Sequence, residues 1–154
     1  MTIHLSRRGA LGLSMGALAL GAGIGAYTSP ARAAKNDSDE LMKKFSAGKE
    51  FVKGKVKLDL PQIAENGNTV PMTVSVESPM TEQSYVTEVM VMADANPRAG
   101  IITFRFTPAS GVAEDNTRIR LAETQNVIAL AKMNDGSVYM ASQEVKVTIG
   151  GCGG

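Results

Sequence analysis

The sequence predicts an all-β fold, an immunoglobulin-like antiparallel β-sandwich with one short N-terminal helix and a glycine-rich C-terminal arm. Three observations predict it. Beyond about residue 55, apolar and polar residues alternate with a period of two, as in half-buried strands. The alternating stretches are short, and turn-forming clusters such as Asn134-Asp135-Gly136 separate them. Regular short strands with such turns are typical of a two-sheet sandwich.

The first expected element is a helix over about residues 38–50. Ser38 is a suitable N-cap, two acidic residues follow in the first turn, and Gly48 is a stop signal. Leu41 and Phe45 are four positions apart and therefore form one apolar stripe. We expect this helix to cover one side or end of the sandwich. Binding of a partner by the helix is the less common alternative.

Seven stretches are expected to be strands, and the segments between them, including 61–68, to be turns. The strands lie at about residues 55–60, 70–77, 85–93, 102–107, 118–121, 127–133 and 138–149. The third is apolar on both parities near its end, which predicts a central strand. Met90 and Met92 are expected to fill the core, and a methionine-lined partner surface is the alternative.

The first 33 residues have the pattern of an export signal. Arg7 and Arg8 precede an uncharged stretch, and Ala31-Arg32-Ala33 forms an A-x-A motif with cleavage after Ala33. The arginine pair predicts the twin-arginine pathway, which exports folded proteins. We therefore expect a periplasmic protein with no membrane attachment after cleavage. An uncleaved anchor is the alternative, because the apolar stretch is nearly long enough to span a bilayer.

Removal of this signal limits the chemistry that remains. The signal contains three arginines and no acidic residue, so residues 34–154 carry a small net negative charge that does not favour nucleic acid. It also contains the only histidine, His4, and a single cysteine cannot form a thiolate cluster. We therefore expect no catalytic residue, no metal and no cofactor. The adjacent carboxylates Asp39-Glu40 and Glu114-Asp115 lie in helix-start and turn contexts.

The chain ends in Gly-Gly-Cys-Gly-Gly, directly after the last expected strand of the domain at 34–149. Cys152 is the only cysteine. Its neighbours Gly150, Gly151, Gly153 and Gly154 predict a flexible arm, residues 150–154, that packs against nothing. At about 3.3–3.6 Å per residue, the thiol can stand roughly 10 Å clear of the domain.

This pattern favours a covalent substrate carrier over an enzyme. A catalytic thiol needs a nearby base, and the nearest basic residue in sequence is Lys146, so partner enzymes are expected to supply the catalytic groups. Three alternatives remain: a disordered end with an accidental cysteine, a carrier that bears sulfur on its ATP-activated C-terminal carboxylate after Gly-Gly, and a binding module whose tail docks through its backbone. An exposed thiol would also form Cys152–Cys152 disulfide dimers in air.

The sequence resembles the SoxY family, the sulfur-carrier subunits of the periplasmic thiosulfate-oxidising (Sox) system. The resemblance rests on the twin-arginine signal, the histidine-free sandwich and the terminal "VKVTIGGCGG". It implies that Cys152 holds thiosulfate-derived sulfur. It also implies a heterodimer with SoxZ, and transient complexes with the haem c protein SoxAX, with SoxB and, where present, with a sulfane dehydrogenase.

Overall fold

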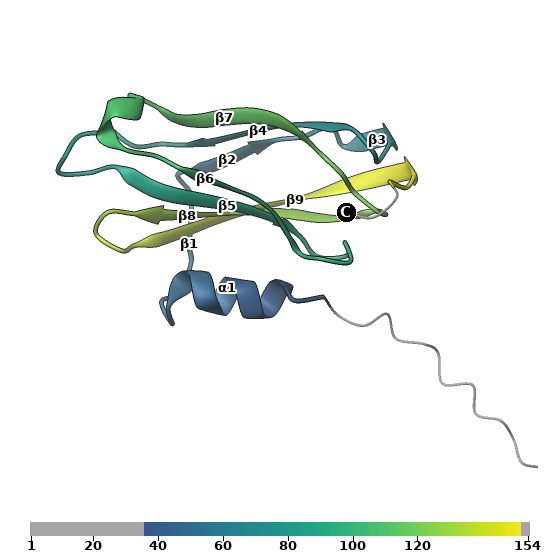
Figure 1. The fold of residues 1–154 in the computed structure, drawn as a ribbon, viewed down its shortest axis with the longest axis horizontal. Helices are drawn as coiled ribbons and strands as arrows, with labels where there is room; N and C mark the ends of the chain where they lie inside the picture. The colour runs from purple at the N-terminus through teal and green to yellow at the C-terminus, as the bar shows by residue number, and fades with distance from the viewer. Residues whose placement is uncertain (1–35, 152–154) are drawn as a thin grey trace, which may run out of the picture. The chain divides into compact units, whose positions relative to one another are not determined.

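The structure is a computed structural model, and it describes residues 36–151. Two β-sheets pack face to face, and one helix lies outside the larger sheet (Figure 1). The prediction of a two-sheet sandwich with a short N-terminal helix is therefore confirmed. The larger sheet has the order β1-β9-β8-β5-β6, with β3 also paired to β9, and the smaller sheet has the order β2-β4-β7.

The elements follow one another as one helix, nine strands and one short 3-10 turn in the described residues. They are α1 (Ser38–Ser46), β1 (Val52–Lys53), β2 (Val56–Asp59), β3 (Ile63–Asn66), β4 (Val70–Val76), β5 (Val86–Ala93), β6 (Gly100–Arg105), η1 (Pro108–Ser110), β7 (Ala113–Ile119), β8 (Gln125–Met133) and β9 (Val138–Ile149). All seven expected strands have a counterpart, but the fifth, expected at 118–121, is β7 at Ala113–Ile119. Glu114 and Asp115 therefore lie in a strand, and their expected turn context is wrong. The structure adds β1 and β3, of which β3 lies within the stretch expected to be a turn.

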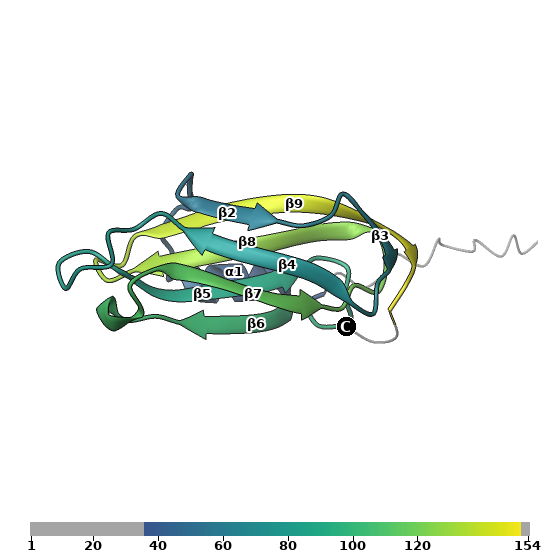
Figure 2. The same ribbon diagram turned by 90° about the horizontal axis from the view of Figure 1, so that it is seen from above.

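The main core lies between the two sheets, and the alternation in β4 explains how it forms. Val70, Met72, Val74 and Val76 are buried, whereas the residues between them are exposed or half-buried. Figure 2 shows β2, β4 and β7 lying over the larger sheet. One face of each strand is therefore buried between the sheets, as the period of two requires.

The central strand β5 is apolar on both faces because each face is covered. Val89 and Val91 belong to the core between the sheets, whereas Met92 packs with Phe45 of α1 on the other face. An irregularity in the pairing of β5 with β8 lies between Val86 and Glu88, and it brings Val86 into the core between the sheets. The methionine side chains therefore fill the space under the helix, as expected of core residues.

The N-cap residue of the helix lies one position before the expected one. Asp37, not Ser38, is the N-cap residue, and the helix ends at Ser46 with Ala47 in the left-handed conformation. The carboxylate of Asp37 makes no capping bond and instead accepts a hydrogen bond of 2.8 Å from the backbone N–H of Ala99. The prediction of Ser38 as the N-cap is wrong, because Ser38 is already the first residue of the helix. Within residues 36–151, no helix combines the length and apolar character needed to cross a bilayer.

Candidate functional site

The last strand, β9, leads directly to the glycine-rich end of the chain, and both of its sides are held there. On one side β3 runs parallel to it, pairing Ile63 with Lys146 and Asn66 with Ile149. On the other side the hydroxyl of Thr124 accepts a hydrogen bond of 2.9 Å from the backbone N–H of Val147. The strand therefore delivers Gly150 and Gly151 to a defined place at this end of the sandwich.

Three chain segments meet at this place through their backbones. The N–H of Gly67 donates to the carbonyl of Ile149 at 2.8 Å, and the N–H of Leu121 donates to the carbonyl of Gly67 at 2.8 Å. The N–H of Gly151 then donates to the carbonyl of Leu121 at 2.9 Å. We call the contact of Gly150 and Gly151 with Gly67, Leu121 and Ala122 the root contact. Gly151 and Gly67 are both buried in it.

The root contact leaves no space for a side chain. A Cβ atom at Gly150 would overlap the carbonyl oxygen of Ala122, and one at Gly67 would overlap the carbonyl oxygen of Leu121. A Cβ at Gly151 would lie 2.8 Å from the carbonyl oxygen of Gly67. Real Cβ atoms do not approach backbone atoms this closely. Glycine is therefore required at these positions for close backbone approach.

A buried amide pair holds the segment that receives Gly151. Asn96 is 1% exposed, and its side chain donates to the carbonyl of Arg120 at 2.9 Å. Its carbonyl oxygen accepts from the N–H of Ala122 at 2.9 Å and from the amide of Gln125 at 2.8 Å. Gln125 in turn accepts from the N–H of Ala95 at 2.9 Å. These bonds fix residues 120–122, and hence the carbonyl to which Gly151 bonds.

The expectation of a tail that packs against nothing is wrong for Gly151, whereas Gly150 is exposed with its backbone close to that of Ala122. Gly150 and Gly151 were expected to be a thin strip clear of the domain, whereas Gly151 is buried and hydrogen-bonded. We expected the absence of side chains to leave these glycines unpacked, but it instead lets their backbone fit between two loops. Cys152, Gly153 and Gly154 lie outside the described residues, as do Arg7, Arg8 and the cleavage position after Ala33.

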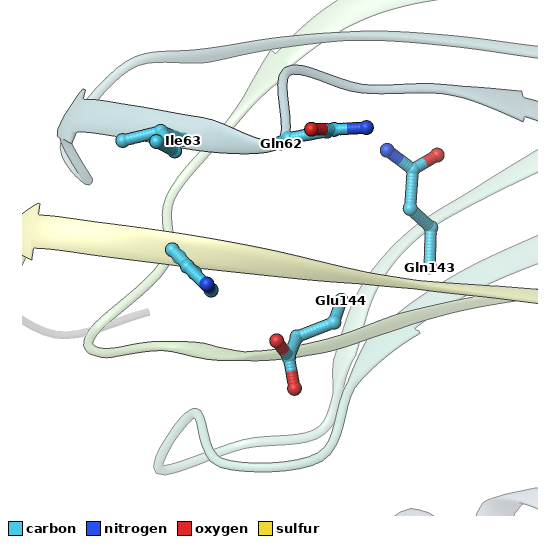
Figure 3. Close-up of a pocket in the computed structure, with 5 residues that line it drawn as sticks. Gln62, Ile63, Gln143 and Glu144 are labelled. Carbon is cyan, nitrogen blue, oxygen red and sulfur yellow. The ribbon is translucent and has the colours of Figure 1, made fainter.

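A shallow hollow lies beside β9, close to the root contact. It has a volume of about 490 Å³ and is lined by Gln62, Ile63, Gln143, Glu144 and Lys146. The side chains of Gln62 and Gln143 face one another across its mouth (Figure 3), and the amide of Gln143 donates to the carbonyl of Leu60 at 2.8 Å. Ile63 is 59% exposed at its rim. The hollow thus combines amide, charged and apolar groups on the open surface next to β9.

The shifted pKa values belong to surface pairs away from the root contact. The pKa of Glu77 is lowered by its hydrogen bond and ion pair with Lys57, whose own pKa is raised by the same contact. The pKa of Asp135 is lowered by hydrogen bonds from the hydroxyl and the N–H of Ser137. In the described part of the chain, no three His, Cys, Asp or Glu side chains gather as a metal site would require. The root contact itself consists of backbone groups, which can hold a segment but supply no nucleophile or base.

The sequence of this chain matches one known protein family over most of its length. The family model described as "Sulfur oxidation protein SoxY" matches residues 42–152. The chain belongs to the SoxY family. The match ends on Cys152 and therefore includes both the root contact and the only cysteine.

A solved structure agrees with this assignment. The sulfur carrier protein SoxY from Chlorobium limicola f thiosulfatophilum is 28% identical, with a TM-score of 0.62 over 73% of this chain and 97% of that chain. A superoxide reductase (neelaredoxin) from Ignicoccus hospitalis is 16% identical, with a TM-score of 0.55 over 61% of this chain and 80% of that chain. At that identity the second likeness concerns the fold alone. No curated protein sequence matches this chain.

Sequence reasoning missed the residues that receive the tail. Gly67 stands in Glu65-Asn66-Gly67-Asn68, which has the composition of an ordinary turn, and Leu121 was expected to end a strand. Asn96 lies in a segment that also has the composition of a turn. The Asn-Gly pair was the only available signal, and it did not indicate that a distant backbone segment approaches Gly67. The contacts join residues far apart in sequence, so no local pattern predicts them.

Proposed function

We propose that this protein is the sulfur-substrate carrier of thiosulfate oxidation and that Cys152 holds the substrate covalently. The observation that carries the proposal is the position of the only cysteine, three residues beyond the end of β9 and at the end of the SoxY family match. The related Chlorobium protein is a sulfur carrier, which supports the same role. The protein itself is not an enzyme in this proposal, because its partners perform the catalysis.

The proposed loading step is an oxidative conjugation at the Cys152 sulfur. Thiosulfate forms an S–S bond with the thiol, Cys–SH + S₂O₃²⁻ → Cys–S–S–SO₃⁻ + H⁺ + 2 e⁻. The two electrons pass to the haem protein SoxAX. SoxB then adds water across the S–SO₃ bond, so that Cys–S–S–SO₃⁻ + H₂O gives Cys–S–SH and HSO₄⁻. A sulfane dehydrogenase, where present, oxidises the sulfur that remains on Cys152.

The proposed partners and location follow from family membership and from the signal. We propose a heterodimer with SoxZ and transient complexes with the enzymes that load and unload Cys152. Export as a folded protein by the twin-arginine pathway, with Arg7 and Arg8 in the signal and cleavage after Ala33, would place the carrier in the periplasm. A SoxZ partner without a signal of its own could cross the membrane already bound to it.

Replacement of Cys152 by serine tests the carrier role. With the purified protein and the other Sox components, Cys152→Ser should reduce thiosulfate-dependent cytochrome c reduction to background, because an alcohol cannot form the S–S bond. Intact-mass analysis of the wild-type protein after exposure to thiosulfate should show reducible adducts on its C-terminal peptide. Full activity of Cys152→Ser would overturn the proposal.

A second candidate function is a binding module whose tail docks through its backbone. The root contact favours it, because Gly150 and Gly151 bind the domain with main-chain atoms and do not require the cysteine. Deletion of residues 150–154 would then impair function, whereas Cys152→Ser would be silent. The carrier role instead requires both variants to fail.

A further inference from the structure

The turn that follows β3 contains Asn66-Gly67, the only Asn-Gly pair in the chain. Asn66 is exposed at the end of β3, whereas Gly67 is buried. The side-chain oxygen of Asn66 accepts a hydrogen bond of 2.9 Å from the backbone N–H of Asn68. The side chain of Asn66 therefore forms an Asx turn over the backbone of Gly67.

An asparagine followed by glycine can lose its amide group without an enzyme, which makes such a pair chemically labile. The backbone nitrogen of the glycine attacks the side-chain carbonyl carbon and closes a succinimide ring. The side-chain amide leaves as ammonia, which takes up the proton of the backbone N–H. Water then opens the ring at either carbonyl and gives aspartate or isoaspartate. No electron is transferred, water is the only co-reactant, and glycine offers no side chain to hinder ring closure.

The structure has two opposite effects on this pair. The hydrogen bond from Asn68 polarises the side-chain carbonyl of Asn66 and would stabilise the negative charge that its oxygen gains during attack. The attacking group is engaged elsewhere, because the N–H of Gly67 donates to the carbonyl of Ile149 at 2.8 Å. Backbone atoms of two other segments also enclose Gly67. Ring closure therefore requires that the bond from Gly67 to Ile149 first open.

We propose that Asn66 is a site of spontaneous deamidation and that the hydrogen bond from Gly67 to Ile149 controls its rate. The closed bond protects Asn66, and each opening frees the nitrogen that attacks it. The same opening exposes this N–H to exchange with solvent, so that deamidation and amide exchange follow one equilibrium. The proposal does not depend on the carrier role of Cys152.

Thr148 holds β3 and β9 together at this point. Its hydroxyl donates to the carbonyl of Glu65 at 2.9 Å, directly before Asn66. The two strands pair Asn66 with Ile149, and the bond from Gly67 to Ile149 is the next one along them. Loss of the Thr148 hydroxyl should therefore let this end of the strand pair open more often.

The hairpin turn before β9 contains a similar pair, Asp135-Gly136, that should not react. The carboxylate of Asp135 accepts hydrogen bonds from the hydroxyl and the N–H of Ser137 at 2.6 and 2.8 Å. These bonds lower the pKa of Asp135, and an ionised carboxylate resists attack by a backbone nitrogen. The N–H of Gly136 is also bonded to the carbonyl of Met133 at 2.9 Å. Asp135 is therefore an internal control in the same sample.

The first measurement follows Asn66 in the full-length processed protein during incubation in mildly alkaline buffer. Peptide mass spectrometry with chromatographic separation should show aspartate and isoaspartate at Asn66, while Asn68 and Asp135 stay unchanged. Conversion in the folded protein should be at least about tenfold slower than in the same protein held in denaturant, because the attacking N–H is bonded and buried. Equal rates in the two samples, or an intact Asn66 in denaturant, would overturn the proposal.

The second measurement compares variants of Thr148. Thr148→Val should raise both the conversion rate of Asn66 and the exchange rate of the Gly67 N–H at least about fivefold, the factor that loss of one net hydrogen bond would produce. Thr148→Ser keeps the hydroxyl and should retain the wild-type rates. Thr103→Val is the matched control, because Thr103 is exposed in β6 at the opposite edge of the sheet, and it should leave both rates unchanged.

Conversion that is insensitive to Thr148→Val, or that changes without a matching change in exchange, would contradict control by the bond to Ile149. If Thr148→Val does not fold, the comparison of folded and denatured wild type still tests the proposal. These readouts use no thiosulfate. A fully active Cys152→Ser would therefore remove the carrier role and leave the result at Asn66 standing.

Discussion

At the scale of single residues, the buried amide of Asn96 links two segments that are far apart in the chain. It is 1% exposed, and it bonds to the backbones of Arg120 and Ala122 and to the side chain of Gln125. A buried polar side chain stabilises a fold only when its hydrogen-bonding groups have partners. The side-chain bonds of Asn96 go to Arg120 and Ala122 in the loop before β8 and to Gln125, the first residue of β8. Asn96 thereby joins the loop before β6 to the loop that receives Gly151.

We expect Asn96→Ala to lower the free energy of unfolding by about 3 kcal/mol, because buried donors and acceptors would lose their partner. Chemical denaturation measures this change. Asn126→Ala is the matched control, since Asn126 bonds to Asp94 at 2.8 Å on the exposed surface and its loss should cost less than about 1 kcal/mol. Equal destabilisation by the two variants would contradict a special role for the buried amide.

At the scale of elements, the helix α1 forms a second, smaller core on the outer face of the larger sheet. Phe45 is 4% exposed and packs with Met92, Leu130 and Val138 on the outer face of the larger sheet. The ammonium group of Lys132 lies 4.5 Å from its ring centroid. The helix has only nine residues, so its stability depends on this packing rather than on its own hydrogen bonds.

Phe45→Ala should therefore lower the free energy of unfolding by about 3–4 kcal/mol through lost burial and the cavity left behind. Lys44→Ala, on the exposed side of the same helix, should have little effect. The Gly151 amide should keep its exchange protection in both variants below their unfolding transitions, because α1 makes no bond to the root contact in the described residues. A loss of that protection in Phe45→Ala alone would show that the helix also supports the chain end.

Some strands were predicted from the sequence, whereas β1 and β3 were not. Six strands were expected within a few residues of their observed bounds because each carries alternating or continuous apolar residues. β7 was expected only at its end, because its sequence is polar between Ala113 and Ile119. β1 has two residues and β3 has four, with Ala64 as the only buried one. Their strand character comes from parallel pairing with β9 rather than from their own pattern. Such edge pairing is a tertiary contact, and the local sequence of β3 favours a turn.

At the scale of the whole molecule, a single terminal thiol predicts a simple mode of self-association. We expect the processed protein to form disulfide-linked dimers in air, because an unpaired cysteine exchanges with other thiols and disulfides. A non-reducing gel should show the dimer in the wild type, its loss on reduction, and none in Cys152→Ser. A wild type that remains monomeric would indicate that the thiol is shielded from a second copy.

The sequence by itself determined the kind of fold and limited the chemistry that side chains can supply. Alternating apolar residues specify a sandwich, because the period of the pattern decides which face of a strand is buried. Residue counts limit the chemistry, since residues 34–154 contain one thiol and no imidazole. The tertiary structure alone decided that Gly150 and Gly151 are held by the domain. That contact joins three backbone segments far apart in the chain, and close approach of backbones depends on the fold and leaves no pattern in a glycine-rich tail.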